Sequence, residues 1–196
     1  MWRLVVLLSL GGFFEFYELF ATGFILPGIS RSGLLSPTTG GLLSLQGYAS
    51  YIAATFAGLF VGSALFGQIA DRYGRRATFM YAVLLYSVSA AAMSVQMRAP
   101  GLVFWRLMTG AGMGIELVTI DAYLIELVPA SYRGRAFAIS HVIGFLAVPA
   151  AAFLAWRVVP LAPFGIDGWR WVVMAGSVGG SSSSYCAATC RKVPAG

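Results

Sequence analysis

Charged residues are scarce in this chain. They make up 10% of its 196 residues, whereas 59% of the residues are hydrophobic and the mean hydropathy is +0.81. A soluble domain cannot cover that much apolar surface with so few charges. The formal net charge is +6, but most basic residues fall in short connections between apolar runs, as cytoplasmic loops require. The composition therefore predicts an integral membrane protein and no nucleic-acid partner.

Cysteine and histidine are scarcer still. The only cysteines are Cys186 and Cys190, near the end of the sequence, and the only histidine is His141. Two such thiols cannot build a disulfide framework or a closed four-ligand metal site. The sequence contains no nucleophile–base motif, phosphate-cradling helix start or metal-ligand spacing. We therefore expect no enzymatic activity, no cofactor and no metal.

Long apolar runs fill most of the chain, and a helix needs roughly 20 apolar residues to cross the hydrocarbon of a bilayer. A sixth run, 169–178, gives way to a glycine- and serine-rich stretch that is too polar to face lipid. We expect the sixth helix to be degraded there. The sequence predicts an all-α, polytopic membrane protein with five firm spans, at 4–28, 47–69, 78–97, 101–124 and 136–159.

The basic residues are unevenly divided between the two sides of the membrane. With the N-terminus inside, the outward side holds Arg31, Arg98, Arg157 and Arg170. The cytoplasmic side holds a larger set, namely Arg3, the arginines at 72–76 and 133–135, Arg191 and Lys192. The positive-inside rule favours this orientation. We expect a multi-pass protein of the bacterial inner (plasma) membrane, with a cytoplasmic N-terminus.

Small residues recur at the spacing of helix-packing faces. Such stripes let helix backbones approach closely inside a membrane. We interpret them as packing surfaces without a functional role; they comprise Ala54, Gly58 and Gly62, then Gly110 and Gly114, then Ala147, Ala151 and Ala155.

Three motifs carry a family resemblance. Residues 67–76 read G-x-x-x-D-R-x-G-R-R, residues 126–135 read E-x-x-P-x-x-x-R-G-R, and the fourth span contains R-x-x-x-G-x-G-x-G from Arg106 to Gly114. Together they resemble the N-terminal half of major facilitator superfamily transporters, in the sugar porter or metabolite:proton symporter branch. The resemblance implies a six-helix bundle made of two three-helix inverted repeats.

The two loop motifs imply a conformational latch on the cytoplasmic side. Opposite charges at helix ends can pair across helices and favour one arrangement of the bundle. The alternative is that the arginines serve only topology and headgroup anchoring. The latch residues implied by the resemblance are Gly67, Asp71, Arg72, Gly74, Arg75, Arg76, Glu126 and Arg133.

Acidic residues within the first span are a second unusual feature. Glu15 and Glu18 lie about 16 and 21 Å along a helix from Leu4, which places both near the bilayer midplane. A carboxylate at that depth is costly to ionise unless a cation is close, and Arg106 in the fourth span can reach it. We predict that Glu18, Arg106 and Glu15 couple transport to protons, the alternative being a fixed structural ion pair. Tyr17-Glu18 also stands where proton-coupled sugar symporters have Tyr-Asp.

Further polar residues inside the spans are candidates for substrate binding. They are His141, Glu116 and Asp121, and His141 stands where sugar porters place a substrate-binding glutamine. The acids could bind a cationic substrate, carry a second proton or line a wet crevice, and the histidine could be a packing residue.

The predicted function is proton-coupled secondary transport of a sugar or small organic acid by alternating access. An efflux antiporter of the same fold and a non-transporting fragment are the alternatives. The implied partners are the substrate, protons, the bilayer, and a missing C-terminal half or a self-pairing copy. We expect residues 1–180 to be the transmembrane half. We expect 181–196 to be an out-of-frame or non-native tail, because one back-translation read two bases later restores the Pro-Glu-Ser-Pro-Arg-Trp motif of sugar porters.

Overall fold

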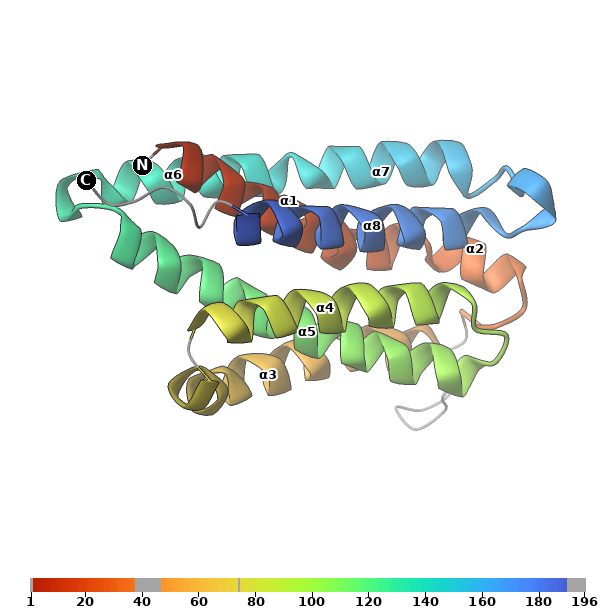
Figure 1. Cartoon of the computed structure of the whole chain (residues 1–196). Helices are drawn as coiled ribbons and strands as arrows, with labels where there is room; N and C mark the ends of the chain where they lie inside the picture. Colours follow the sequence, from red (N-terminus) through yellow and green to blue (C-terminus); the bar gives the residue numbers. More distant parts are fainter. Residues whose placement is uncertain (1, 38–46, 74, 190–196) are drawn as a thin grey trace.

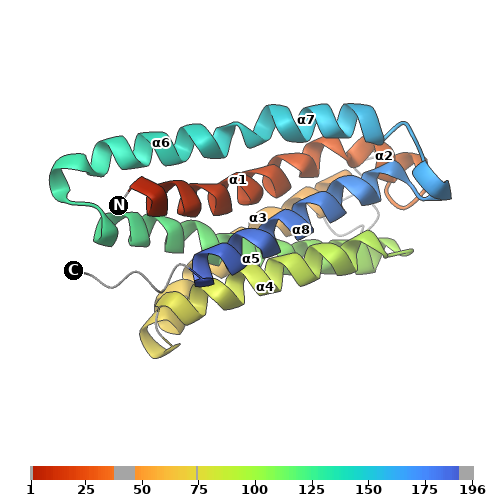
Figure 2. The same cartoon turned by 45° about the horizontal axis from the view of Figure 1, so that its top comes forward.

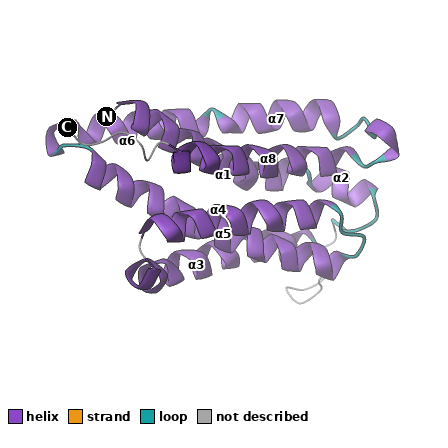
Figure 3. Cartoon of the chain, in the orientation of Figure 1, coloured by secondary structure: helices purple, strands orange, loops and turns teal. Residues whose placement is uncertain are grey.

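The structure, a computed structural model, describes residues 2–37, 47–73 and 75–189, without the side chains at 3, 4, 7, 65–76, 123, 127 and 181–189. Nearly all of the described chain is helical (Figure 3). The elements are α1 (Trp2–Phe24), α2 (Leu26–Arg31), α3 (Tyr48–Tyr73), α4 (Arg75–Ser94), α5 (Ala99–Leu127), the 3-10 turn η1 (Ala130–Tyr132), α6 (Arg133–Phe145), α7 (Ala147–Val158), the 3-10 turn η2 (Pro163–Gly165) and α8 (Gly168–Thr189).

Each of the five predicted spans coincides with helix, but the first and fifth are interrupted. The first divides at Ile25 into α1 and α2, and the fifth divides at Leu146 into α6 and α7. Pro27 and Pro149 follow these breaks by two and three residues. Since proline has no backbone N–H to bond the carbonyl four residues earlier, it interrupts the helix there. By length and composition, three segments of the described part qualify as membrane spans: Ala77–Ser94, Ala99–Glu126 and Ala130–Val158.

The helices form one bundle built from two related units (Figures 1 and 2). The first unit is α1 to α4 and the second is α5 to α8. The contact of α1 with α6 and α7 corresponds to the contact of α5 with α3. The contact of α1 with α8 corresponds to the contact of α5 with α4. Each contact maps onto its counterpart when the units are exchanged. This arrangement agrees with the predicted pair of three-helix repeats.

The predicted small-residue packing between the second and fourth spans is confirmed in the contact of α3 with α5. A Cβ atom added at Gly58 would lie 2.8 Å from the backbone nitrogen of Ala111, and one at Gly62 would meet the Ala111 backbone. Gly110 and Gly114 face the backbone of α3 in the same way. Without side chains at these positions, the two helix backbones lie in direct contact.

The alanines of the fifth span are packed inward too. Ala147, Ala151 and Ala155 of α7 are buried in the core that also contains Ala21 of α1 and Val172 of α8. This prediction is likewise confirmed.

The turn predicted at 67–76 is helical along most of its length. The backbone of α3 continues to Tyr73 and α4 begins at Arg75, and Gly74 lies outside the described residues. Because a helix pairs its own backbone N–H and C=O groups, α3 and α4 can extend beyond the apolar runs without leaving these groups unsatisfied.

The expected breakdown of the sixth helix after Val178 is corrected by the structure, because the backbone of α8 stays helical to Thr189. Gly176 lies against the carboxyl group of Glu18, and Gly179 lies against the ring of Phe14, both on α1. These glycines therefore face α1 rather than lipid. They allow α8 to approach α1 more closely than larger residues would.

Arg170, expected only as an outward-facing charge, fastens the start of α8 to the end of α4. It is 8% exposed. Its guanidinium donates hydrogen bonds to the carbonyl oxygens of Ser94 and Gln96, the latter at 2.9 Å, and its Nε lies 3.3 Å from Asp167 Oδ2. A cation at a helix C-terminus satisfies free carbonyls and interacts favourably with the helix dipole.

Candidate functional site

Glu18 of α1 and Arg106 of α5 form an ion pair in the interior of the bundle. Arg106 Nη1 lies 3.4 Å from Glu18 Oε2, and the two side chains are 0% and 1% exposed. One oxygen of the carboxylate, Glu18 Oε1, has no hydrogen-bond partner among the described atoms. The structure thus brings together the acid and the cation that the sequence predicted to pair.

Arg106 also binds groups that the sequence analysis missed. Its Nε donates to Thr55 Oγ1 at 3.0 Å, and its Nη2 donates to the Glu18 carbonyl oxygen at 3.0 Å and to Thr22 Oγ1. The ring of Tyr51 lies 5.6 Å from the guanidinium carbon. Helical spacing gave a partial signal, because Thr22 follows Glu18 by four residues and so shares its face of α1. Nothing in the sequence connected α3 to the site.

This arrangement leaves the guanidinium well supplied with acceptors even without the carboxylate. Thr55 and Thr22 remain in place because their hydroxyls also donate to carbonyl oxygens one turn earlier, at 3.1 and 3.0 Å. Neutralising Glu18 would therefore remove the Coulomb attraction without leaving the buried cation unsolvated.

Glu15 lies with other acids rather than with Arg106. It lines a cavity of about 70 Å³ together with Asp121 of α5 and His141 of α6, and Phe16 and Ser140 complete much of the wall. Glu15 interacts electrostatically with both Asp121 and Glu116. Glu116 is fully buried beside Gly11 of α1, and neither of its carboxyl oxygens has a partner among the described atoms.

His141 stands at the rim of this cavity. Its side chain is exposed, Nδ1 lies 3.0 Å from the Phe137 carbonyl oxygen, and it interacts electrostatically with Asp121. Nε2 is thus the ring nitrogen available to a ligand if Nδ1 carries the proton. Within the described part of the chain, no three His, Cys, Asp or Glu side chains are arranged to hold a metal ion.

The latch residues are only partly visible. Gly74 lies outside the described residues. The structure does not describe the side chains of Asp71, Arg72, Arg75 and Arg76. The contacts of these residues, and the part of Gly67 in the latch, therefore stay predictions. Arg133 Nε donates to the carbonyl oxygen of Val128 at 3.1 Å, which closes the turn after α5. Glu126 is exposed near the end of the same helix.

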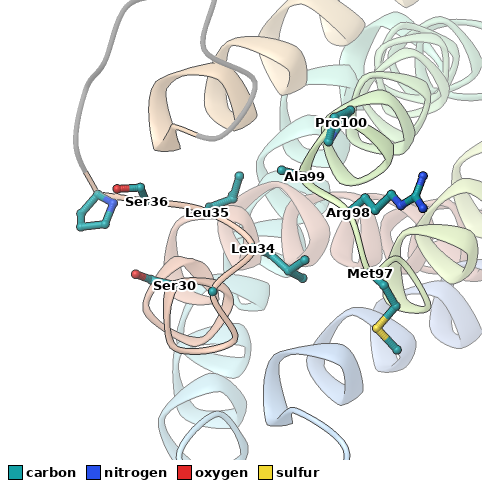
Figure 4. A pocket seen from close by; sticks show the side chains of 10 residues that line it. Ser30, Leu34, Leu35, Ser36, Met97, Arg98, Ala99 and Pro100 are labelled. Atoms are coloured by element: carbon teal, nitrogen blue, oxygen red, sulfur yellow. The ribbon is translucent and has the colours of Figure 1, made fainter.

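A larger hollow of about 590 Å³ opens at the other end of the bundle, away from the N-terminus (Figures 1 and 4). It lies between the chain that follows α2 and the connection from α4 to α5, with Leu34, Leu35, Arg98 and Pro100 among its lining residues (Figure 4). Of the predicted site residues that the structure describes, none contributes to it.

Residues 8–193 match the family model described as Major Facilitator Superfamily. The chain belongs to this superfamily. With its apolar helices, it is an integral, multi-pass membrane protein, and it corresponds to the N-terminal half of the superfamily fold.

Individual relatives agree with this assignment. The protein YyaJ of Bacillus subtilis (strain 168), which is named for metabolite transport, is 32% identical over 137 residues, which are 70% of this chain and 30% of that protein. The niacin transporter NiaP of Acinetobacter baylyi is 26% identical over 98% of this chain and 40% of its own length. The chain thus spans well under half of these relatives.

Solved structures show the same fold. The proton:xylose symporter XylE superposes with a TM-score of 0.83 and 18% identity, covering 98% of this chain and 44% of the XylE chain. The POT family transporter PepTSo superposes with a TM-score of 0.71 and 16% identity, over 95% of this chain and 37% of that chain.

Proposed function

We propose that this chain forms one half of a proton-coupled secondary transporter for a sugar or small organic acid. The observation that carries the proposal is the Glu18–Arg106 pair, a carboxylate and a guanidinium that are both removed from solvent and yet lie within the wall of a transporter bundle. Ionisable residues at membrane depth mark ion or substrate pathways more often than structural pairs. The names of XylE and NiaP support a proton, a sugar or a small carboxylic acid as cargo.

The pair would work as a switch between two arrangements of the helices. While Glu18 is ionised, its attraction to Arg106 holds α1 against α5. A proton on Glu18 removes that attraction, whereas Arg106 stays bonded to Thr55 and Thr22. The energy that separates the two arrangements then depends on protonation, and a proton gradient biases the side to which the cavity opens.

The substrate would meet this chain at the cavity of His141 and Asp121. His141 is exposed there, and while its Nδ1 donates to the Phe137 carbonyl oxygen, its Nε2 can accept a hydrogen bond from a substrate hydroxyl. Asp121 can also accept from a hydroxyl. Glu116, the third candidate for substrate binding, is fully buried and is not among the residues that line this cavity. A closed pathway needs a second six-helix wall, which we assign to a C-terminal half or a second copy of this chain.

The test is uptake by liposomes that contain this chain together with a matching C-terminal half. Labelled xylose and labelled niacin are offered with and without an inward proton gradient. We expect gradient-driven accumulation of one of them. Glu18→Gln should abolish accumulation but leave exchange of substrate across the membrane intact, because the neutral side chain removes the effect of protonation while the two arrangements can still interconvert.

Asp167→Asn is the control, because it removes an acid that lies at the start of α8 and is 42% exposed. It should leave accumulation unchanged. Accumulation that survives Glu18→Gln would refute the coupling role. Transport that runs only outward in exchange for protons would instead identify an efflux antiporter.

A further inference from the structure

A second pair of carboxyl groups is buried close to the Glu18–Arg106 pair. Glu15 lies one turn before Glu18 on α1 and is 3% exposed, and Glu116 of α5 is 0% exposed. Glu15 Oε1 and both carboxyl oxygens of Glu116 have no hydrogen-bond partner among the described atoms. Buried polar atoms without partners are rare and costly, so each one requires an explanation.

The absence of a side chain at Gly11 brings the two carboxyls near each other. A Cβ atom at Gly11 would lie 3.2 Å from Glu116 Oε1, so the Glu116 carboxyl rests directly on the backbone of α1. Gly11 precedes Glu15 by one helical turn, and residues four apart share a face of the helix. The buried carboxyl groups of Glu15 and Glu116 therefore lie at the same part of the contact between α1 and α5.

No arginine or lysine whose side chain the structure describes forms an ion pair with Glu15 or Glu116. Both ion pairs found among the described side chains lie elsewhere. The titratable neighbours are Glu18 on α1, Asp121 on α5, the buried and unpartnered hydroxyl of Tyr86 on α4, and His141 on α6 beyond Asp121. Two carboxylates this close in a medium of low dielectric constant repel each other strongly, and one proton between them removes the repulsion.

We propose that Glu15 and Glu116 form a carboxyl pair that binds one exchangeable proton, separate from the Glu18–Arg106 switch. The proton adds to one carboxyl oxygen and is donated in a hydrogen bond to the other carboxylate; on release it returns to water. Its route is the cavity that Glu15 shares with Asp121 and His141. The transporter would then carry two proton sites in this half. Proton binding at the pair is measurable in this chain alone, whether or not it transports.

Infrared spectroscopy of the full chain in lipid nanodiscs tests the proposal, because a protonated carboxyl group has its own C=O absorption, which shifts in D2O. At neutral pH we expect such a band in Glu18→Gln, in which Glu18 cannot contribute one. The triple variant Glu15→Gln/Glu18→Gln/Glu116→Gln should lose it. A band that persists in the triple variant, or that is missing from Glu18→Gln, overturns the proposal.

A matched pair of glycine variants tests the geometry without removing a carboxyl group. Gly11→Ala places a methyl group 3.2 Å from Glu116 Oε1, whereas a Cβ at Gly23, also on α1, has nothing within 4 Å. We expect Gly11→Ala to shift the band and Gly23→Ala to leave it in place. Equal spectra for the two variants would refute the assignment of the band to carboxyl groups beside Gly11. Since the uptake assay depends on Glu18, failure of either proposal is distinguishable from failure of the other.

Discussion

Arg106 is the residue on which the site depends, because it gathers acceptors from two other helices. Glu18 and Thr22 come from α1, and Thr55 comes from α3. Each acceptor compensates part of the loss of water around a buried guanidinium. The ion pair is therefore one part of a network rather than an isolated contact.

Thr55→Val tests that network. The substitution keeps the shape of the side chain but removes the acceptor of the Arg106 Nε hydrogen bond. A hydrogen bond to a charged group contributes about 1.5–3 kcal/mol, so we expect a comparable loss in the free energy of unfolding in mixed micelles.

Thr109→Val is the matched control for Thr55→Val. Thr109 is also fully buried, but its hydroxyl donates only to the Trp105 carbonyl oxygen of its own helix. The free energy of unfolding should fall less in Thr109→Val than in Thr55→Val, by about 0.5–1.5 kcal/mol. Equal losses for the two variants would mean that Thr55 does not support Arg106.

The sequence anticipated Glu18 and Arg106 but not their companions, for a physical reason. An arginine at membrane depth needs an acidic partner, so Arg106 pointed to the acids of the first span. Threonines are ordinary in membrane helices, where the hydroxyl bonds the helix carbonyl one turn back. Only the crossing of α1, α3 and α5 shows that two of them also bind the guanidinium.

At the scale of elements, close contact between helix backbones positions the site. Gly58 of α3 lies directly against the backbone of Ala111 of α5. Gly58 is one helical turn from Thr55, and Ala111 is on the same helix as Arg106. Small residues at such crossings let the two helix backbones approach closely and make van der Waals contact.

Gly58→Ala should therefore destabilise the bundle. The added methyl group meets backbone atoms of α5, which cannot move aside as a flexible side chain could. Overpacking of this kind lowers the free energy of unfolding by about 1–3 kcal/mol. The measurement is the unfolding temperature in detergent, which should fall.

Gly23→Ala is its control, since a Cβ at Gly23 of α1 has nothing within 4 Å. Alanine is the better helix former, so this variant should be unchanged or more stable by up to about 1 kcal/mol. A Gly58→Ala protein as stable as Gly23→Ala would contradict the packing seen between α3 and α5.

Helix boundaries were harder to predict than helices. Glycines and charges at 67–76 are typical of a turn, yet every residue of this stretch whose backbone the structure describes belongs to α3 or α4. The glycines of α8 likewise suggested a broken helix, although Gly176 and Gly179 face α1. Glycine in a sequence does not distinguish a turn from a packing contact, because that depends on the neighbouring helix.

At the scale of the whole molecule, the connections divide between two ends of the bundle. The N-terminus and the turn η1 lie at one end, and η2 lies at the other (Figure 1). Phe164 in η2 is 92% exposed, and Ser131 in η1 is exposed too. The distribution of arginines predicts that the η1 end faces the cytoplasm.

Cysteine labelling in intact cells tests this orientation. With Cys186 and Cys190 replaced by serine, Phe164→Cys should react with a membrane-impermeant maleimide added outside. Ser131→Cys should react only after the membrane is permeabilised. The reverse pattern would invert the topology and with it the direction of every proton step proposed above.

The sequence by itself determined that the chain is a helical membrane protein of this superfamily, because apolar length, the scarcity of charge and the positions of arginine are properties of the chain read in order. The tertiary structure decided which buried charges meet. Glu15 and Glu18 lie three residues apart on one helix, yet one faces Arg106 and the other faces Glu116 and Asp121. Their partners come from α5, and their different surroundings are set by how α5 crosses α1 within the bundle, which no spacing along α1 records.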